Sequence, residues 1–386
     1  MLLKHSPQDF IVNEIYDLEQ LKESKGEGGN YAYFIFTKTN LAQQKAIIFL
    51  AQKLQIASKR IHCCGTKDKI AVTTQLISIQ QCNKEKAQEF AQIINSQSED
   101  MKLEYVGQFN QRLNLSDNQG NKFEITLRDV SEEEKQQFLT QKQHFNVYNL
   151  FQSQRFGVCQ NTHKIGLLLI QNNIKDALFE ILQSLPQEAQ EENNNYIQLC
   201  QEIQTHFTQL LQDELREKYK QLQELFPQFL NGYETVLNHL INTPKDVSGA
   251  LRTIPKKVRT LYIHAFQSAI FNEVILNYVN EHKQKGIELP ENVYLIGANM
   301  KPQMSGYEKS IEILDRLNLK LEDLQLNHMP ELQLFAIEKP LYSQVENYEC
   351  REVDETTLQL SFKLRVGCYA TQVISEIVGD EEIITF

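Results

Sequence analysis

The chain has 386 residues, of which 41% are hydrophobic and 23% charged, and its 50 acidic against 39 basic residues give a formal net charge of -11. This composition is typical of a globular protein of two or three domains and excludes collagen-like, coiled-coil and wholly disordered chains. The acidic balance argues against uniform coating of nucleic acid, because phosphate binding depends on Lys and Arg, but it leaves room for a local basic groove.

Cysteine usage and hydropathy indicate a cytoplasmic protein. The seven cysteines are scattered, and their odd number suits a reducing compartment. No apolar run approaches the roughly 20 residues that span a bilayer, and the N-terminal stretch turns polar too early for a signal peptide. The sequence "HCCG" at 62–65 places His and Cys side by side. Adjacent ligands fit a tetrahedral site poorly, so we expect small core-facing side chains there and no metal.

The first part of the chain, to about residue 165, mixes strand and helix patterns. Strands are expected at 31–39, 70–79, 101–109 and 122–130, where aromatic and β-branched residues are frequent. A helix is expected at 41–54 with Asn40 as its N-cap, and another after Ser131, because Glu134 follows it at capping-box spacing. The stretch "GTKDKIAVTTQ" at 65–75 indicates a polar turn with Asp68 at the entrance of a strand.

The middle of the chain, to about residue 279, has a helical pattern. We expect an exposed loop at the polar stretch 185–196, and strand character returns at 358–364 before a turn and a short helix. The sequence therefore predicts an α+β protein with a helix-rich domain, residues 166–341, inserted into a sheet domain formed by residues 1–165 and 342–386. Six apolar residues are spaced for one helix face and are expected in the core: Ile203, Phe207, Leu211, Leu215, Leu222 and Phe226.

Four motifs combine functional side chains with special backbone contexts. They are "SPQDFIVNE" at 6–14, "GTKDKIAVTTQ" at 65–75, "NLFQSQRFG" at 149–157, and "HAFQSAIFN" at 264–272 together with "GCYATQVISE" at 367–376. Each alone has an ordinary structural explanation. Together and in this order they resemble the TruD family of pseudouridine synthases. The family's Gly-x-Lys-Asp-Lys-x-Ala-x-Thr-x-Gln motif is filled at every fixed place, by Gly65, Lys67, Asp68, Lys69, Ala71, Thr73 and Gln75.

The chain departs from the family's pattern at a few positions. Gln152 and Gln160 stand where relatives commonly have Gly, and we expect Gln152 to alter a local turn, because glycine permits backbone angles that glutamine resists. Tyr369 stands where some relatives have Phe. Little of the segment 290–340 can be matched.

The resemblance implies a mixed or antiparallel sheet catalytic domain of pseudouridine synthase type with an inserted helical domain. It also implies isomerisation of uridine in tRNA, at position 13, without cofactor or metal. Asp68 would be the nucleophile and Lys4 its ion-pair partner, although Lys67 and Lys69 are nearer in sequence. Those two lysines are otherwise expected to face RNA phosphate or the fold.

The resemblance also implies how RNA is held. Phe10, Phe151 and Tyr369 would contact the base or sugar, and Asn149 would read the uracil edge, although core packing is the ordinary explanation for Phe10 and Phe151. Between residues 245 and 264 five cations accompany Asp246 alone, so we expect this segment to contact phosphate. The expected RNA-binding residues are Lys67, Lys69, Arg155, Arg252, Lys256, Lys257 and Arg259.

Two alternatives of other classes remain open from the sequence. One is a catalytically silent RNA-binding or RNA-chaperone protein on the same scaffold. The other is a helical interaction protein whose 200–226 stripe binds a partner. For the leading interpretation we expect RNA, in the first place tRNA, as the partner, with neither a membrane nor an obligate protein partner.

Overall fold

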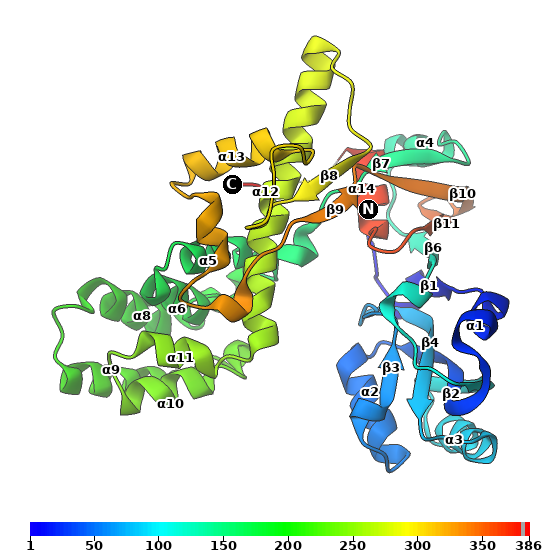
Figure 1. The fold of residues 1–386 in the computed structure, drawn as a ribbon, viewed down its shortest axis with the longest axis horizontal. Helices are drawn as coiled ribbons and strands as arrows, with labels where there is room; N and C mark the ends of the chain where they lie inside the picture. Colours follow the sequence, from blue (N-terminus) through cyan, green and yellow to red (C-terminus); the bar gives the residue numbers. More distant parts are fainter. Residues whose placement is uncertain (380–382) are drawn as a thin grey trace. The chain divides into compact units, whose positions relative to one another are not determined.

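The structure, a computed structural model, describes residues 1–379 and 383–386 (Figure 1). Contacts divide the chain into two compact units. The first comprises Met1–Val147 and the segment that begins at Tyr342, and the second comprises Tyr148–Leu341 and the last residues of the chain. The fold is α+β, as predicted from the sequence. The domain limits expected at residues 165 and 341 stay a prediction.

The first unit is built on a mixed sheet. Its strand order is β5-β2-β4-β1-β6-β11-β10-β7, and β3 pairs with β4. β1 pairs with β4 in parallel, whereas β2 pairs with β4 and β5, and β6 with β1 and β11, in antiparallel fashion. The strands are β1 (Phe10–Ile15), β2 (Glu27–Thr39), β3 (Ile61–Cys63), β4 (Val72–Gln80), β5 (Met101–Phe109), β6 (Gly120–Leu127), β7 (Phe145–Tyr148), β10 (Tyr342–Asp354) and β11 (Thr357–Leu364).

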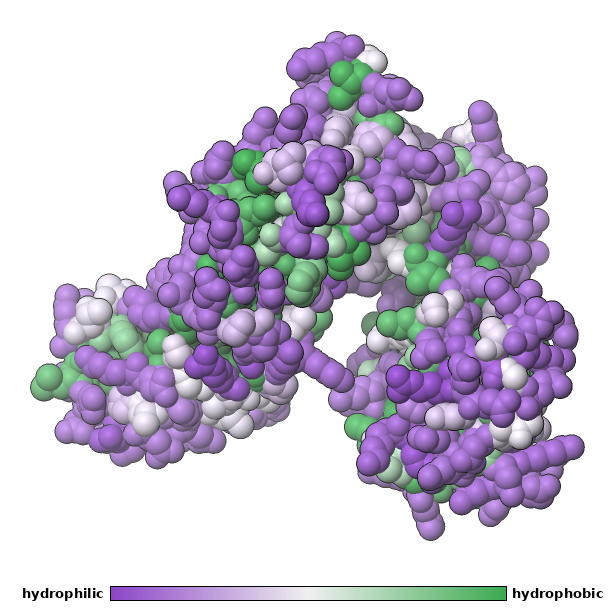
Figure 2. Space-filling view, in the orientation of Figure 1, coloured by the Kyte–Doolittle hydropathy of each residue, from purple (hydrophilic) through white to green (hydrophobic). Residues whose placement is uncertain are grey.

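Helices cover this sheet and form apolar cores with it, two of which contain α2, α3 and α14. One core joins β2, β4 and β5 to α2 and α3 and includes Phe36, Ile77 and Phe90. The other joins β6 and β11 to α14 and includes Phe123 and Ile374. Hydrophilic residues dominate the face shown in Figure 2, as expected when apolar side chains turn inward. The helices are α1 (Leu18–Lys25), α2 (Gln43–Lys53), α3 (Lys84–Gln97), α4 (Glu132–Leu139) and α14 (Ala370–Val378).

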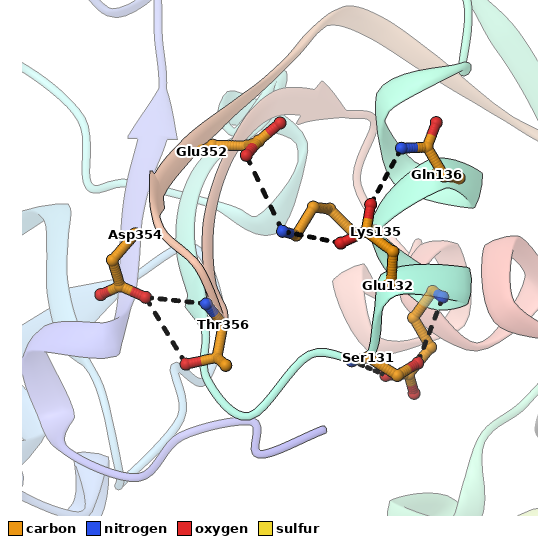
Figure 3. Close-up of polar contacts among 8 residues, drawn as sticks. Ser131, Glu132, Lys135, Gln136, Glu352, Asp354 and Thr356 are labelled. Atoms are coloured by element: carbon orange, nitrogen blue, oxygen red, sulfur yellow. Dashed lines mark hydrogen bonds and ion pairs between the residues drawn. The ribbon is translucent and has the colours of Figure 1, made fainter.

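The start of α4 follows the sequence prediction closely. The Ser131 side chain accepts the Glu134 N–H, and the Glu134 carboxylate accepts the Ser131 N–H at 2.8 Å, which completes a capping box. One turn later, the Lys135 ammonium lies 3.1 Å from a carboxylate oxygen of Glu132 and 3.8 Å from one of Glu352 on β10 (Figure 3). The helix is therefore capped locally and tied to the sheet.

The second unit is organised around α12 (Lys256–Lys285), against which α5 (Thr162–Ile170) packs closely (Figure 1). A Cβ at Gly166 of α5 would lie 2.2 Å from the Tyr262 carbonyl oxygen of α12, so only glycine allows this approach. Among the described residues no helix is long and apolar enough to cross a membrane. The other elements are α6 (Ile174–Leu182), α7 (Gln187–Gln190), α8 (Asn194–His206), α9 (Gln212–Glu224), α10 (Glu234–Asn242), α11 (Val247–Thr253), β8 (Asn292–Leu295), α13 (Tyr307–Arg316) and β9 (Ile337–Pro340).

Three local predictions are wrong. Asn40 does not cap α2: it has a positive φ of 50° and Ala42 occupies the N-cap position. The stretch 185–196 is not simply an exposed loop, because it contains α7 and the start of α8, where Tyr196 is 1% exposed. The apolar stripe at 203–226 is divided between α8 and α9, and Leu211 between them is 70% exposed.

Candidate active site

Asp68 lies in the loop between β3 and β4, where its side chain keeps 38% exposure. Its Oδ2 lies 3.3 Å from Nζ of Lys4. The partner of the carboxylate is therefore Lys4 and not Lys67 or Lys69. Two contacts hold the loop backbone: Lys38 Nζ donates to the Asp68 carbonyl at 2.6 Å, and the Asn40 N–H donates to the Ala71 carbonyl at 3.1 Å. The loop thus presents a carboxylate beside one cation on a held backbone.

Lys4 is positioned by the N-terminal segment rather than by a regular element. It has a positive φ of 59°, and its ammonium lies 4.1 Å from the ring centroid of Phe10. The buried Asp9 anchors this segment, because its carboxylate accepts two bonds from Arg128, at 2.8 and 3.1 Å, and one from the Ser6 N–H at 2.9 Å. The hydrogen bond from Arg128 holds the pKa of Asp9 below its usual value in spite of burial.

Lys67 has a different environment from the one expected. Its side chain is 7% exposed, and Nζ lies 2.8 Å from Oε1 of Glu14, whose side chain is 1% exposed. Glu14 also accepts bonds from the Asn118 side chain at 3.0 Å and the Leu76 N–H at 2.9 Å. This enclosure favours the alternative that Lys67 serves the fold, and its contact with RNA phosphate stays a prediction. Lys69 is exposed, and its RNA contact stays a prediction.

Lys38 is a residue that the sequence interpretation missed. It is 0% exposed, on the face of β2 that also carries Phe34 and Phe36. Burial lowers the pKa of Lys38 to about 8, the Asp68 charge opposes that shift, and the Lys67 charge adds to it. The alternation of inward residues in "YFIFTKT" was the signal that could have found it.

The two aromatic residues expected to contact the base in the first unit have unequal exposure. Phe10 is 1% exposed and packs edge-to-face on Phe123 with ring centroids 6.1 Å apart. Its present contacts are those of a core residue, with the Lys4 ammonium over its ring. Tyr369 is half-buried at the N-cap position of α14. Both contacts with the base stay predictions.

Asn149 and Phe151 belong to the second unit, where they share supporting contacts. Asn149 is 4% exposed, and its side-chain amide donates to the Pro340 carbonyl at 3.2 Å. The side chain of Asn272 on α12 accepts the Phe151 N–H at 2.8 Å and donates to the Phe151 carbonyl at 2.9 Å. Lys339 donates to the Asn149 carbonyl, and its ammonium lies 4.5 Å from the Phe151 ring centroid. Residues 290–340, little of which could be matched to the family pattern, thus help to hold both residues through β9.

The other expected RNA-binding cations fall into two groups. Lys256, Lys257 and Arg252 are exposed, although Arg252 also donates to the His328 carbonyl at 3.0 Å. Arg259 is 7% exposed and bonds to Glu331 at 2.7 Å, and its contact with phosphate stays a prediction.

The last expected cation, Arg155, is half-buried. Its Nε donates to the Ser268 hydroxyl at 2.9 Å, and its guanidinium lies 5.3 Å from the Phe151 ring centroid. Its RNA contact stays a prediction.

The two glutamines at family glycine positions have opposite backbone conformations. Gln152 has φ of -85°, which any residue adopts, so its backbone carries no strain, and the expected alteration of the turn stays a prediction. Gln160 has a positive φ of 50°, in the left-handed region that favours glycine. The backbone strain therefore lies at Gln160.

Comparison with known proteins gives consistent matches over most of the chain. Residues 1–293 and 279–377 match the family described as tRNA pseudouridine synthase D (TruD). A probable tRNA pseudouridine synthase D from Methanococcoides burtonii is 27% identical and covers 99% of this chain and 93% of its own. One from Methanosarcina mazei is 32% identical over 71% of this chain and 59% of its own. The crystal structure of a putative tRNA pseudouridine synthase D from Methanosarcina mazei superposes with a TM-score of 0.69 at 24% identity, over 98% of this chain and 93% of its own, which shows a shared fold.

Proposed function

The chain belongs to the tRNA pseudouridine synthase D (TruD) family, whose reaction converts uridine to pseudouridine, and on that premise we propose that Asp68 is the nucleophile. The observation that carries this proposal is the loop between β3 and β4. It offers a carboxylate that is 38% exposed, 3.3 Å from a cation, on a backbone bonded to a buried lysine. A reactive carboxylate needs access to its substrate and a fixed position, and this loop supplies both.

The chemistry assigns distinct tasks to the residues around Asp68. The bond between N1 of uracil and the ribose breaks, the base turns, and C5 bonds to the same ribose carbon, while C5 loses a proton and N1 gains one. Asp68 would attack or stabilise the ribose carbon when the first bond breaks. Lys4 would orient the carboxylate through their ion pair, and the Phe10 ring would hold the Lys4 ammonium in place.

Three further side chains are proposed to recognise the uridine. We propose that Tyr369 stacks on the extruded base or its sugar, and that Asn149 reads the uracil edge beside Phe151. The contacts of Asn272 and Lys339 support this, because Asn272 fixes the backbone of Phe151 and Lys339 bonds to the carbonyl of Asn149. The proposed substrate is tRNA with the target uridine at position 13.

The deciding experiment measures tritium release from C5-labelled uridine in a tRNA transcript under single-turnover conditions. Asp68→Asn keeps the shape of the side chain and removes its charge, and we expect a loss of about 10³-fold or more. Asp100→Asn, at an exposed aspartate of the same unit, should leave the rate unchanged. Retained turnover by the Asp68→Asn variant would refute the proposal.

The same assay also tests the target position and the alternative function. A transcript with cytidine at position 13 should bind but release no tritium, and release from it would refute that position. Wild-type protein that binds tRNA without any release would instead support the silent RNA-binding alternative.

A further inference from the structure

Lys38 is a fully buried cation whose ammonium bonds to the backbone of the proposed nucleophile. Its Nζ donates to the Asp68 carbonyl at 2.6 Å, and the residue is 0% exposed. Burying a lysine charge is costly unless it is paired and hydrogen-bonded, and Met, Leu or Gln would fill a similar volume without that cost. A buried ammonium that contacts Asp68 therefore needs a reason beyond packing.

The surroundings of Lys38 give its charge one favourable neighbour. On β2 it stands opposite Thr73 of β4 and Met101 of β5, neither of which carries a charge. The charged groups that act on it are Asp68, which attracts it, and Lys67, which repels it. Lys67 is itself paired with Glu14, so the carboxylate that stabilises the Lys38 charge is that of Asp68.

Two lysines thus hold different parts of the same residue. Lys4 contacts the carboxylate of Asp68 at 3.3 Å, and Lys38 contacts its main-chain carbonyl at 2.6 Å. The first contact orients the carboxylate group, whereas the second fixes the position of the main chain that carries it. A displacement of about 1 Å at a reacting group can cost on the order of 100-fold in rate.

We propose that Lys38 is a positioning residue for the isomerisation: its charged ammonium fixes the main chain of Asp68 and so aims the carboxylate at the substrate. This inference rests on the proposed role of Asp68 as nucleophile. A charged donor makes a shorter and stronger bond to a carbonyl than a neutral amine does. Loss of the Lys38 proton would therefore loosen the loop and slow the reaction without removing any group that touches RNA.

The proposal has a pH signature because the Lys38 pKa is lowered to about 8. Single-turnover tritium release should fall as pH rises through this region in the wild type. Lys38→Met should be slower by about 10- to 100-fold at pH 7 and should lack this fall. Lys38→Arg, which stays charged, should recover part of the rate at pH 7 and also lack the fall.

Lys102→Met serves as the matched control, because Lys102 is exposed on the neighbouring strand β5 and should keep the wild-type rate and profile. Uridine itself also titrates as pH rises, and because all variants share this effect, the Lys102→Met profile shows how large it is. Hydrogen exchange of β4 peptides reports on the fold of each variant. A positioning role predicts that Lys38→Met keeps the exchange protection of β4 while losing rate.

Two outcomes would overturn the inference. The first is a Lys38→Met variant that keeps the wild-type rate and pH profile. The second is a Lys38→Met variant whose loss of rate is matched by a loss of exchange protection in β4, which would assign Lys38 a structural role alone. Asp68→Asn, assayed in parallel, separates the two proposals. An active Asp68→Asn variant refutes the proposed nucleophile, whereas an inactive one beside an unaffected Lys38→Met variant refutes only the role of Lys38.

Discussion

Glu14→Gln should destabilise the first unit strongly, because it removes the partner of a buried charge. The side chains of Glu14 and Lys67 are 1% and 7% exposed, and their charged atoms lie 2.8 Å apart. Glutamine keeps the shape but leaves the Lys67 ammonium uncompensated, which costs about 3–5 kcal/mol in a buried pair. The new amide group must also face the Leu76 N–H, the Asn118 amide or Lys67, all of which are donors to Glu14.

A double-mutant cycle measures this interaction. Lys67→Met alone should cost a similar amount, since it leaves the Glu14 carboxylate buried. The double variant removes both charges and should lose at least about 2 kcal/mol less than the sum of the single losses. Glu124→Gln is the control: Lys122 and Glu124 are 43% and 34% exposed, and such a surface pair contributes less than about 1 kcal/mol.

The assay must resolve the first unit from the second, because an unfolding curve of the whole chain would mix them. Hydrogen exchange of peptides from β1 and β4 across a urea series gives the local free energy of unfolding. Filter binding of tRNA gives the second observable. The reasoning is refuted if Lys67→Met keeps the exchange protection of these strands but weakens tRNA binding and flattens its salt dependence, since Lys67 would then face phosphate.

Three further predictions concern the backbone, the RNA surface and pH. Gln160→Gly should stabilise the second unit by up to about 1 kcal/mol, because φ at this position is +50°. Gln152→Gly, at φ of -85°, should destabilise the same unit, and the hydrogen-exchange protection of its peptides distinguishes the two variants. Lys256→Glu and Lys257→Glu should weaken tRNA binding and each lower the salt slope by about 1, measured by filter binding, and an unchanged affinity would mean a merely solvated helix start. The folded-state pKa of Lys38, about 8, lies below its ordinary value of 10.5, so the unfolded chain binds the extra proton between these values. The stability of the wild type should therefore rise by about 3 kcal/mol from pH 8 to 10.5 relative to Lys38→Met, measured by urea-dependent proteolysis, and identical pH dependence in both proteins would refute this.

Local patterns predicted several strands and helices of the first unit but not α1, β3, α3 or β7. The strand expected at 101–109 is β5, Met101–Phe109, and the inward residues expected at 358–364 are at most 3% exposed. These features depend on periodicity and caps, which short stretches of sequence carry. The break between α8 and α9 was missed, because the 3.6-residue spacing of apolar residues continues across it.

The candidate site was predictable only where a motif names a residue. The sequence singled out Asp68, and its resemblance to a family pointed to Lys4, 64 positions away. It could not tell that Lys67, next to Asp68, turns into a buried pair with Glu14, because neighbouring residues in a loop point in directions that only the packed chain decides. The ion pair of Arg259 was missed for the same reason, since its partner Glu331 is 72 residues distant.

The sequence by itself determined the fold class, several elements of the first unit and the aspartate on which the proposed chemistry depends. Only the tertiary structure decided which cations accompany that aspartate. The parallel pairing of β1 with β4 brings the N-terminal segment to the Asp68 loop, and the position of Lys38 on the inner face of β2 places its ammonium at the Asp68 carbonyl. Each of these contacts joins residues at least 30 positions apart, and such contacts arise from strand order and burial, which no local pattern encodes.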